Sequence, residues 1–188
     1  PGYRHVSDDN VRDIYSQLLG VPILPEPGLR IPNMFDAALD GSFLALYVQG
    51  EDVAQSDPNT QHVHAALAAM ELVIVQDLFL NETAKFAHVF LPGTSFLEKD
   101  GTFTNAERRI NRVRPVMAPK NGMADWEITL TIAKAMGFEM AYGHPSEIME
   151  EIAALTPTFA DVSYDLLDRV GSVQWPCNEK APEGTPVM

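Results

Sequence analysis

Residues 71–109 read ELVIVQDLFLNETAKFAHVFLPGTSFLEKDGTFTNAERR, and this stretch is the most informative part of the chain. The run 71–76 is almost entirely apolar and ends at a carboxylate, Asp77, which is typical of a strand buried on both faces. Asn81 then offers a side-chain oxygen that can cap a short helix over 82–87. The beginning of the stretch is therefore predicted to be a strand followed by a helix.

A second short strand is predicted over 88–91, and it stops at Pro92-Gly93. Upstream, the apolar run 43–48 has the length of a strand, and Asp57-Pro58 is predicted to start the helix that follows it. The order from residue 43 is thus β, α, β, α, β. Short connections and right-handed crossovers convert that order into a parallel sheet covered by helices. Open sheets of this type hold ligands at the carboxyl ends of their strands.

We therefore predict an α/β fold with an open, mainly parallel, Rossmann-like sheet flanked by helices and with extra helices after the sheet. Residues 1–42 are predicted to form a helical and loop-rich lead-in, 43–140 the α/β region, and 141–188 a helical extension with an irregular tail. The regular alternation stops near residue 95. Residues 95–114 are predicted to be a long polar loop, with a short edge strand at 113–116.

Composition and charge exclude several classes of function. The chain has 188 residues, of which 46% are hydrophobic and 21% are charged, as in ordinary globular proteins. Thirteen Lys and Arg against 26 Asp and Glu give a formal charge of −13. That charge repels nucleic acid and anionic membranes, so we expect neither as a partner. A phosphate group must then be held by local donors, such as backbone N–H groups or a single lysine.

The single cysteine, Cys177, excludes an internal disulfide and any iron–sulfur cluster made by this chain alone. No run approaches ~20 apolar residues and no leader opens the chain, so we expect a cytoplasmic protein. The five histidines have no His or Cys partner at ligand spacing. We therefore predict no metal site and find no catalytic set.

Two polar pairs, Gly50-Glu51 and Gln76-Asp77, each follow a predicted buried strand. Because parallel strands end at the same edge, both pairs are expected to face one ligand crevice. A carboxylate there can accept two hydrogen bonds from a ribose diol or from the edge of a guanine base. The alternative for Asp77 is that it only caps the turn after its strand.

Three further features are ambiguous when taken singly. Lys99 lies in a tight polar turn, where it can place a charge on a phosphate or a base carbonyl, or can simply be solvated. Asp125 opens a predicted helix and can be no more than its cap. A cluster of arginines can contact an anionic cofactor, dock an acidic neighbouring domain, or form a solvated loop face. Its members are Arg108, Arg109, Arg112 and Arg114.

At this point the residues resemble a known family. The segment VIVQDLFLNETAKFAHVFLPGTSFLEKDGTFTNAERRINR at 73–112 closely resembles part of the catalytic subunits of the dimethyl sulfoxide reductase family. These molybdenum or tungsten enzymes carry a pair of molybdopterin guanine dinucleotides. The pieces PGYRHV at 1–6, YVQGED at 47–52 and VQWPC at 173–177 are similar to formate dehydrogenase large subunits. The resemblance covers essentially the whole chain.

The resemblance implies a pocket for the nucleotide half of one pterin cofactor within 43–140. Its lining would be Gly50, Glu51, Gln76 and Asp77, with Lys99 and Asp125 contacting the same nucleotide. A carboxylate accepts the N1–H and N2–H groups of guanine, whereas adenine presents an acceptor at N1. Losing two such charge-assisted bonds, each about 1.5–3 kcal/mol, disfavours adenine strongly. Which acid would contact the base and which the ribose stays open, as does molybdenum versus tungsten.

The resemblance also implies that this chain is a middle segment of a larger catalytic subunit. The metal-binding cysteine or selenocysteine, its histidine and the substrate arginine of the family all precede the matched region. The iron–sulfur cysteines and the C-terminal β-barrel domain of the family are absent from this chain too, and Cys177 does not match the metal ligand. The parent would oxidise formate to carbon dioxide through the metal and iron–sulfur centres, beside further domains and electron-transfer subunits. The segment alone would be inactive. The alternatives are another molybdopterin oxidoreductase, such as a nitrate reductase, or a non-catalytic acidic interaction module.

Overall fold

The computed structural model describes residues 4–186, which form two compact units. The parallel unit consists of Gly28–Glu98 and Ala118–Asp125. The antiparallel unit consists of the described residues up to Pro27, Lys99–Met117 and the described residues from Trp126 on. The predicted domain boundaries after residues 42 and 140 stay a prediction.

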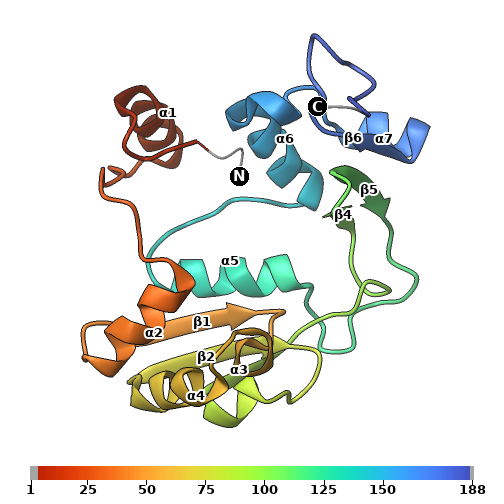
Figure 1. Ribbon diagram of the computed structural model, residues 1–188. Coiled ribbons are helices and arrows are strands. Elements are labelled where there is room, and N and C mark those ends of the chain that lie inside the picture. Colours follow the sequence, from red (N-terminus) through yellow and green to blue (C-terminus); the bar gives the residue numbers. More distant parts are fainter. Residues whose placement is uncertain (1–3, 187–188) are drawn as a thin grey trace. The chain divides into compact units, whose positions relative to one another are not determined.

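The parallel unit contains a sheet of three strands in the order β1-β2-β3 (Figure 1). The strands are β1 (Ala45–Gln49), β2 (Leu72–Asp77) and β3 (Val89–Pro92). All pairings are parallel, with Gln49 opposite Gln76 and Asp77 opposite Pro92. The predicted parallel α/β sheet is confirmed. Its register brings the carboxyl ends of the three strands to one edge.

Helices pack against one face of this sheet and form its core. They are α2 (Ile31–Leu39), α3 (Val53–Ser56), α4 (Thr60–Ala69) and the short 3-10 helix η1 (Thr83–Phe86). Alternate residues of β2, Val73 and Val75, point to this face because side chains alternate along a strand, and both are fully buried. They belong to the same apolar cluster as Val63 and Leu67 of α4.

The starts of the two helical segments that follow β1 and β2 agree only in part with the sequence predictions. Asn81 caps as predicted, because its Oδ1 accepts a hydrogen bond of 2.9 Å from the N–H of Ala84, although the element is a 3-10 helix. The predicted helix start at Asp57-Pro58 is wrong. Asp57 instead ends α3, since its N–H donates to the carbonyl of Val53, and α4 begins after Asn59, which has a φ of 62°.

The antiparallel unit contains a second sheet that the sequence analysis missed. Its strands, in the order β4-β5-β6, are β4 (Gly101–Thr104), β5 (Arg109–Val113) and β6 (Ser172–Gln174). The predicted loop over 95–114 is therefore wrong where β4 and β5 form, although 95–100 is irregular as predicted, and the edge strand predicted at 113–116 is wrong because β5 ends at Val113. Asn105 makes the hairpin, because its Oδ1 accepts from the N–H of Arg109 at 3.0 Å. Arg108 takes the left-handed conformation there, with a φ of 68°.

Helices complete the antiparallel unit. They are α1 (Asp9–Leu19), α5 (Asp125–Ala135, of which the first residue belongs to the parallel unit), α6 (Pro145–Leu155), the 3-10 helix η2 (Pro157–Phe159) and α7 (Tyr164–Val170). Helix α1 is capped by Asp8 and ends at Gly20, which has a φ of 68°. The core joins Ile110 of β5 to Leu167 of α7 and to the buried thiol of Cys177. Within residues 4–186, no helix is both long and apolar enough to span a bilayer.

Candidate functional site: the carboxyl edge of the parallel sheet

Backbone hydrogen bonds join the segments that follow the three parallel strands. The N–H of Gly50 donates to the carbonyl of Gln76 at 2.9 Å, and the N–H of Gly93 donates to the carbonyl of Asp77 at 2.9 Å. The structure thus brings Gly50-Glu51 and Gln76-Asp77 together at one edge of the sheet.

Both polar atoms of the Gln76 side-chain amide are hydrogen-bonded. Only 1% of the residue is exposed. Its Nε2 donates to Oδ1 of Asp125 at 2.9 Å, and its Oε1 accepts from the hydroxyl of Tyr47. A buried amide needs such partners, because leaving it unsatisfied costs about 1–3 kcal/mol. Gln76 therefore has an internal role, and it places Asp125 at the same edge.

Asp125 also holds the segment after β3. Its Oδ1 accepts from the N–H of Thr94 at 3.1 Å, and its Oδ2 accepts from the Thr94 hydroxyl at 3.0 Å. Gly93 permits this approach, since a Cβ there would lie 3.1 Å from Asp125 Oδ1 and 3.3 Å from the carbonyl carbon of Asp77. Gly93 was predicted only as the end of a strand, and Thr94 was not predicted as part of the site. The PGT run after a strand was the available signal.

Asp77 caps the turn after β2, as the structural alternative predicted. Its Oδ1 accepts from the N–H groups of Leu78 at 2.6 Å and Phe79 at 3.4 Å, and its Oδ2 accepts from Nδ2 of Asn81 at 3.1 Å. A carboxylate oxygen can accept two hydrogen bonds, so Oδ2 keeps acceptor capacity. The half-buried Asp77 can therefore hold this turn and also receive a donor from a ligand.

The remaining predicted residues differ in their placement. Glu51 is exposed, and its Oε1 accepts from the hydroxyl of Ser56 at 2.7 Å. Gly50 has a φ of 65°, and no atom lies within 4 Å of the position that a Cβ would take. Lys99 belongs to the antiparallel unit, so its part in the site stays a prediction.

The segment Ala118–Asp125, which we call the strap, is fixed to the segment after β3 by a second acid. Glu98 accepts from the N–H of Ser95 at 3.0 Å, from its hydroxyl at 2.7 Å, and from the N–H of Lys120 at 2.9 Å. The Ser95 hydroxyl contributes most, and together with the two N–H groups it lowers the pKa of Glu98 to about 2. Asn121 adds a bond from Nδ2 to the carbonyl of Pro92 at 2.5 Å.

Glu98 predicts a pH dependence for the strap. The lowered pKa means that the carboxylate stabilises the folded state fully above about pH 4.5, and that this stabilisation is lost as the pH falls toward about 2. Hydrogen exchange of the strap amides, corrected for intrinsic rates, should therefore quicken across that interval. Glu98→Gln should exchange faster at neutral pH and lose the pH dependence. Glu71→Gln, an exposed acid before β2, is the control, and equal behaviour of both variants would contradict the assignment.

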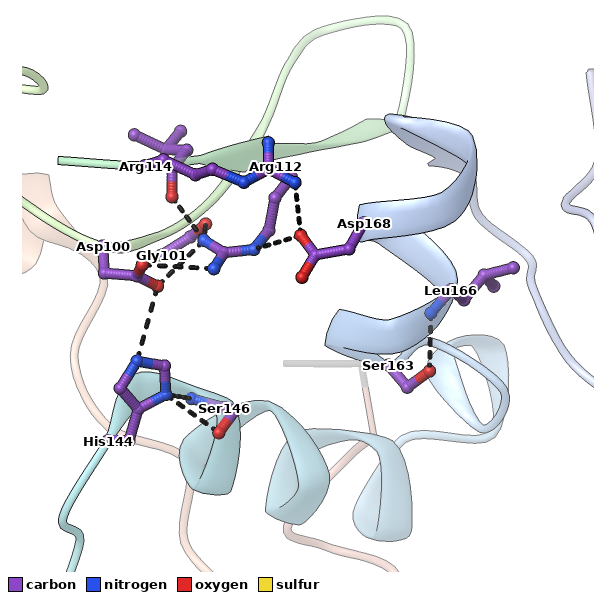
Figure 2. A network of polar contacts seen from close by, with 10 residues as sticks. Asp100, Gly101, Arg112, Arg114, His144, Ser146, Ser163, Leu166 and Asp168 are labelled. Atoms are coloured by element: carbon purple, nitrogen blue, oxygen red, sulfur yellow. Dashed lines mark hydrogen bonds and ion pairs between the residues drawn. The ribbon is translucent and has the colours of Figure 1, made fainter. Parts of the chain in front are cut away.

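The arginine cluster has its observed partners inside the antiparallel unit. Arg112 pairs with Asp100 at 2.8 Å and with Asp168 at 3.1 Å, and Arg114 also pairs with Asp168 (Figure 2). Arg108 lies over the ring of Trp175, 5.6 Å from its centroid. These contacts give the cluster a structural role. Among residues 4–186, no group of three or more His, Cys, Asp or Glu side chains is arranged to hold a metal ion.

Comparison with a solved structure shows the fold. An acetylene hydratase from Pelobacter acetylenicus superposes with a TM-score of 0.61 over 91% of this chain and 24% of its own chain. The sequence identity is 18%, so this likeness shows the fold alone.

Comparison with sequences narrows the assignment. A probable oxidoreductase of Bacillus subtilis is 44% identical over 95% of this chain. Proteins named as presumed formate dehydrogenases are 45% identical over 98% of it in Staphylococcus haemolyticus and 42% identical over 100% of it in Bacillus subtilis. The chain spans only 18–19% of the length of these relatives, so it corresponds to a segment of a larger subunit. Residues 22–135, more than half of the chain, match the family model for molybdopterin oxidoreductases. With this match and a wound parallel sheet whose polar residues meet at one edge, the chain belongs to the molybdopterin oxidoreductase family.

Proposed function

We propose that this chain is the cofactor-binding segment of a formate dehydrogenase catalytic subunit, and that the carboxyl edge of its parallel sheet holds the nucleotide half of molybdopterin guanine dinucleotide. The observation that carries the proposal is the gathering of Gly50, Glu51, Asp77 and Asp125 at that edge. The family match supports a pterin cofactor, and the names of the relatives favour formate as the substrate of the whole subunit.

The residues at the edge fit a guanosine moiety. Guanine and ribose both present donors, and carboxylates are the acceptors that bind such donors most strongly. Gly50 leaves open space beside Glu51, so a ligand can approach the backbone closely. In this proposal Glu51 and Asp77 face the nucleoside, while the buried Gln76 positions Asp125 rather than touching the ligand. Lys99 would neutralise part of the diphosphate charge.

In the proposal, this chain binds the cofactor and the rest of the parent subunit carries out the redox chemistry. The molybdenum or tungsten of the bound cofactor would accept the two electrons of formate oxidation, and iron–sulfur centres elsewhere in the parent would receive them. This chain contributes binding and orientation and supplies no catalytic residue in the proposal. Its partners are the remaining domains of the subunit and electron-transfer subunits. A cytoplasmic location is part of the same proposal.

Exposed apolar side chains support a place inside a larger subunit. Phe79 and Leu80, which follow the capped turn of Asp77, are 75% and 78% exposed, and Phe96 is 62% exposed. Phe79 and Leu80 are neighbours in the chain, and large apolar side chains exposed together usually mark an interface. In the proposal the remaining domains of the parent cover them.

Analysis of released nucleotides tests the proposed function. The full-length protein would be purified, denatured in acid, and assayed for metal and for nucleotide by mass spectrometry. We expect guanine nucleotide in a fixed ratio to molybdenum or tungsten, together with formate-dependent dye reduction. Cytosine nucleotide, or metal without any nucleotide, would contradict the cofactor assignment. Reduction of nitrate without oxidation of formate would contradict the substrate assignment.

A further inference from the structure

A second polar cluster, which we call the clasp, fastens the segment after β1 to the segment after β2. Asp52 Oδ1 accepts from the N–H of Thr83 at 2.9 Å and from its hydroxyl at 2.6 Å. Asp52 Oδ2 accepts from the N–H of Glu82 at 3.3 Å and from Nε2 of Gln55 at 2.8 Å. The Thr83 hydroxyl in turn accepts from the N–H of Ala54 at 3.0 Å. Each segment thus satisfies polar groups of the other.

Burial and charge suit the clasp to a purely internal role. Thr83 is fully buried and Ala54 nearly so, hence their polar groups depend on these partners. Partial burial of Asp52 opposes its ionisation, but the Thr83 hydroxyl and the N–H groups of Thr83 and Glu82 outweigh it and lower the pKa of Asp52. With four donors already on its two oxygens, Asp52 offers little to a ligand.

The clasp connects the segment that carries Glu51 to the segment that carries Asp77. Asp52 directly follows Glu51. On the other side, Asn81 donates to Asp77 and caps the N–H of Ala84, so Asp77 is coupled to the short helix that carries Thr83. A continuous set of contacts therefore leads from Glu51 to Asp77 beneath the edge of the sheet.

We infer that Asp52 and Thr83 are positioning residues that set the spacing between Glu51 and Asp77 and so preorganise the nucleotide pocket. This inference rests on the proposed function. Like charges at one edge repel each other, and α3 is a helix of only four residues, Val53–Ser56. The segment after β1 therefore needs an anchor to keep its acid in place. Preorganisation of this kind strengthens binding because less conformational freedom is lost when the ligand binds, and such differences in affinity lie mostly in the dissociation rate.

The test uses Thr83→Val in the full-length protein, since valine keeps the shape of threonine but lacks the hydroxyl. We expect faster hydrogen exchange in peptides covering 50–56 of the cofactor-free protein. We also expect the guanine nucleotide cofactor to dissociate about tenfold faster, as for the loss of one strong hydrogen bond. Thr83→Ser should restore both quantities. Ser42→Ala is the matched control, because it removes an exposed hydroxyl that donates to Ala37 at 3.3 Å before β1.

The outcomes separate the inference from the proposed function. If wild-type protein contains no guanine nucleotide, the proposed function fails, whatever the exchange data show. If Thr83→Val exchanges faster but retains cofactor as well as Ser42→Ala does, the clasp is merely structural and the inference is overturned. Unchanged exchange over 50–56 would also overturn it. Should Thr83→Val not fold, Asp52→Asn applies the same test, with the same expected direction for exchange and cofactor release.

Discussion

Replacement of Asp77 by alanine in the full-length protein is expected to remove most of its guanine nucleotide and metal. In the proposed site Asp77 accepts one hydrogen bond from guanine or ribose at the remaining acceptor position of its Oδ2, which also accepts from Asn81. A charge-assisted bond contributes about 1.5–3 kcal/mol, so losing it weakens binding by roughly one to two powers of ten. The measurement is nucleotide and metal content per protein after gel filtration, with unfolding temperature recorded in parallel.

Alanine also removes the cap of the turn at Leu78, so a second variant is needed. Asp77→Asn retains an oxygen for the turn but replaces the other acceptor by an NH₂ donor, which opposes the donors of guanine. It should therefore lose cofactor nearly as completely as alanine, with less effect on stability. Glu71→Gln, at the opposite end of β2, should keep its full cofactor content. Normal cofactor content in both Asp77 variants would exclude Asp77 from the site.

The parallel sheet could be predicted because its signals are local. The apolar runs that became β1 and β2 end at polar residues, and the segments between strands suit helices. The second sheet could not be predicted in this way, since β5 pairs with β6, whose residues follow some sixty positions later, for example Ile110 opposite Val173. The polar hairpin at Asn105 looked like a loop because β5 carries two arginines. Those arginines are paired with acids, and the sequence does not show that pairing.

The candidate site shows the same limit. The sequence could place Gln76 and Asp125 near a strand end and a helix start, but the bond between their side chains spans 49 positions. The structure shows that the Gln76 amide is satisfied by internal partners and that Asp125 also accepts hydrogen bonds from Thr94. The clasp at Asp52 was missed for the same reason, because its partner Thr83 lies 31 positions away. A polar side chain that hydrogen-bonds a residue far along the chain cannot be distinguished in the sequence from one that binds a ligand.

Replacement of Arg112 by methionine is expected to destabilise the antiparallel unit by about 3–5 kcal/mol, which is typical when one partner of a buried ion pair is removed. The Arg112 side chain is only 7% exposed, and its guanidinium reaches both Asp100 and Asp168 (Figure 2). It also lies 4.1 Å from the centre of the Tyr164 ring. Burial raises the pKa of Tyr164 to about 12, so the ring is neutral and contacts the guanidinium through its π face. Denaturant unfolding and hydrogen exchange in β5 and α7 measure the effect.

The matched control is Arg114→Met, because Arg114 contacts the same Asp168 but is 56% exposed. Exposed pairs contribute about 0–1 kcal/mol, so the control should be nearly neutral.

The cause of the stability lost in Arg112→Met can also be isolated. If it comes from leaving Asp100 without its cation, Asp100→Asn in the Arg112→Met background should recover part of the stability, since the amide removes the uncompensated charge. No recovery would mean that Arg112 acts through packing on Tyr164. Equal losses for Arg112→Met and Arg114→Met would show that burial does not decide the strength of this network.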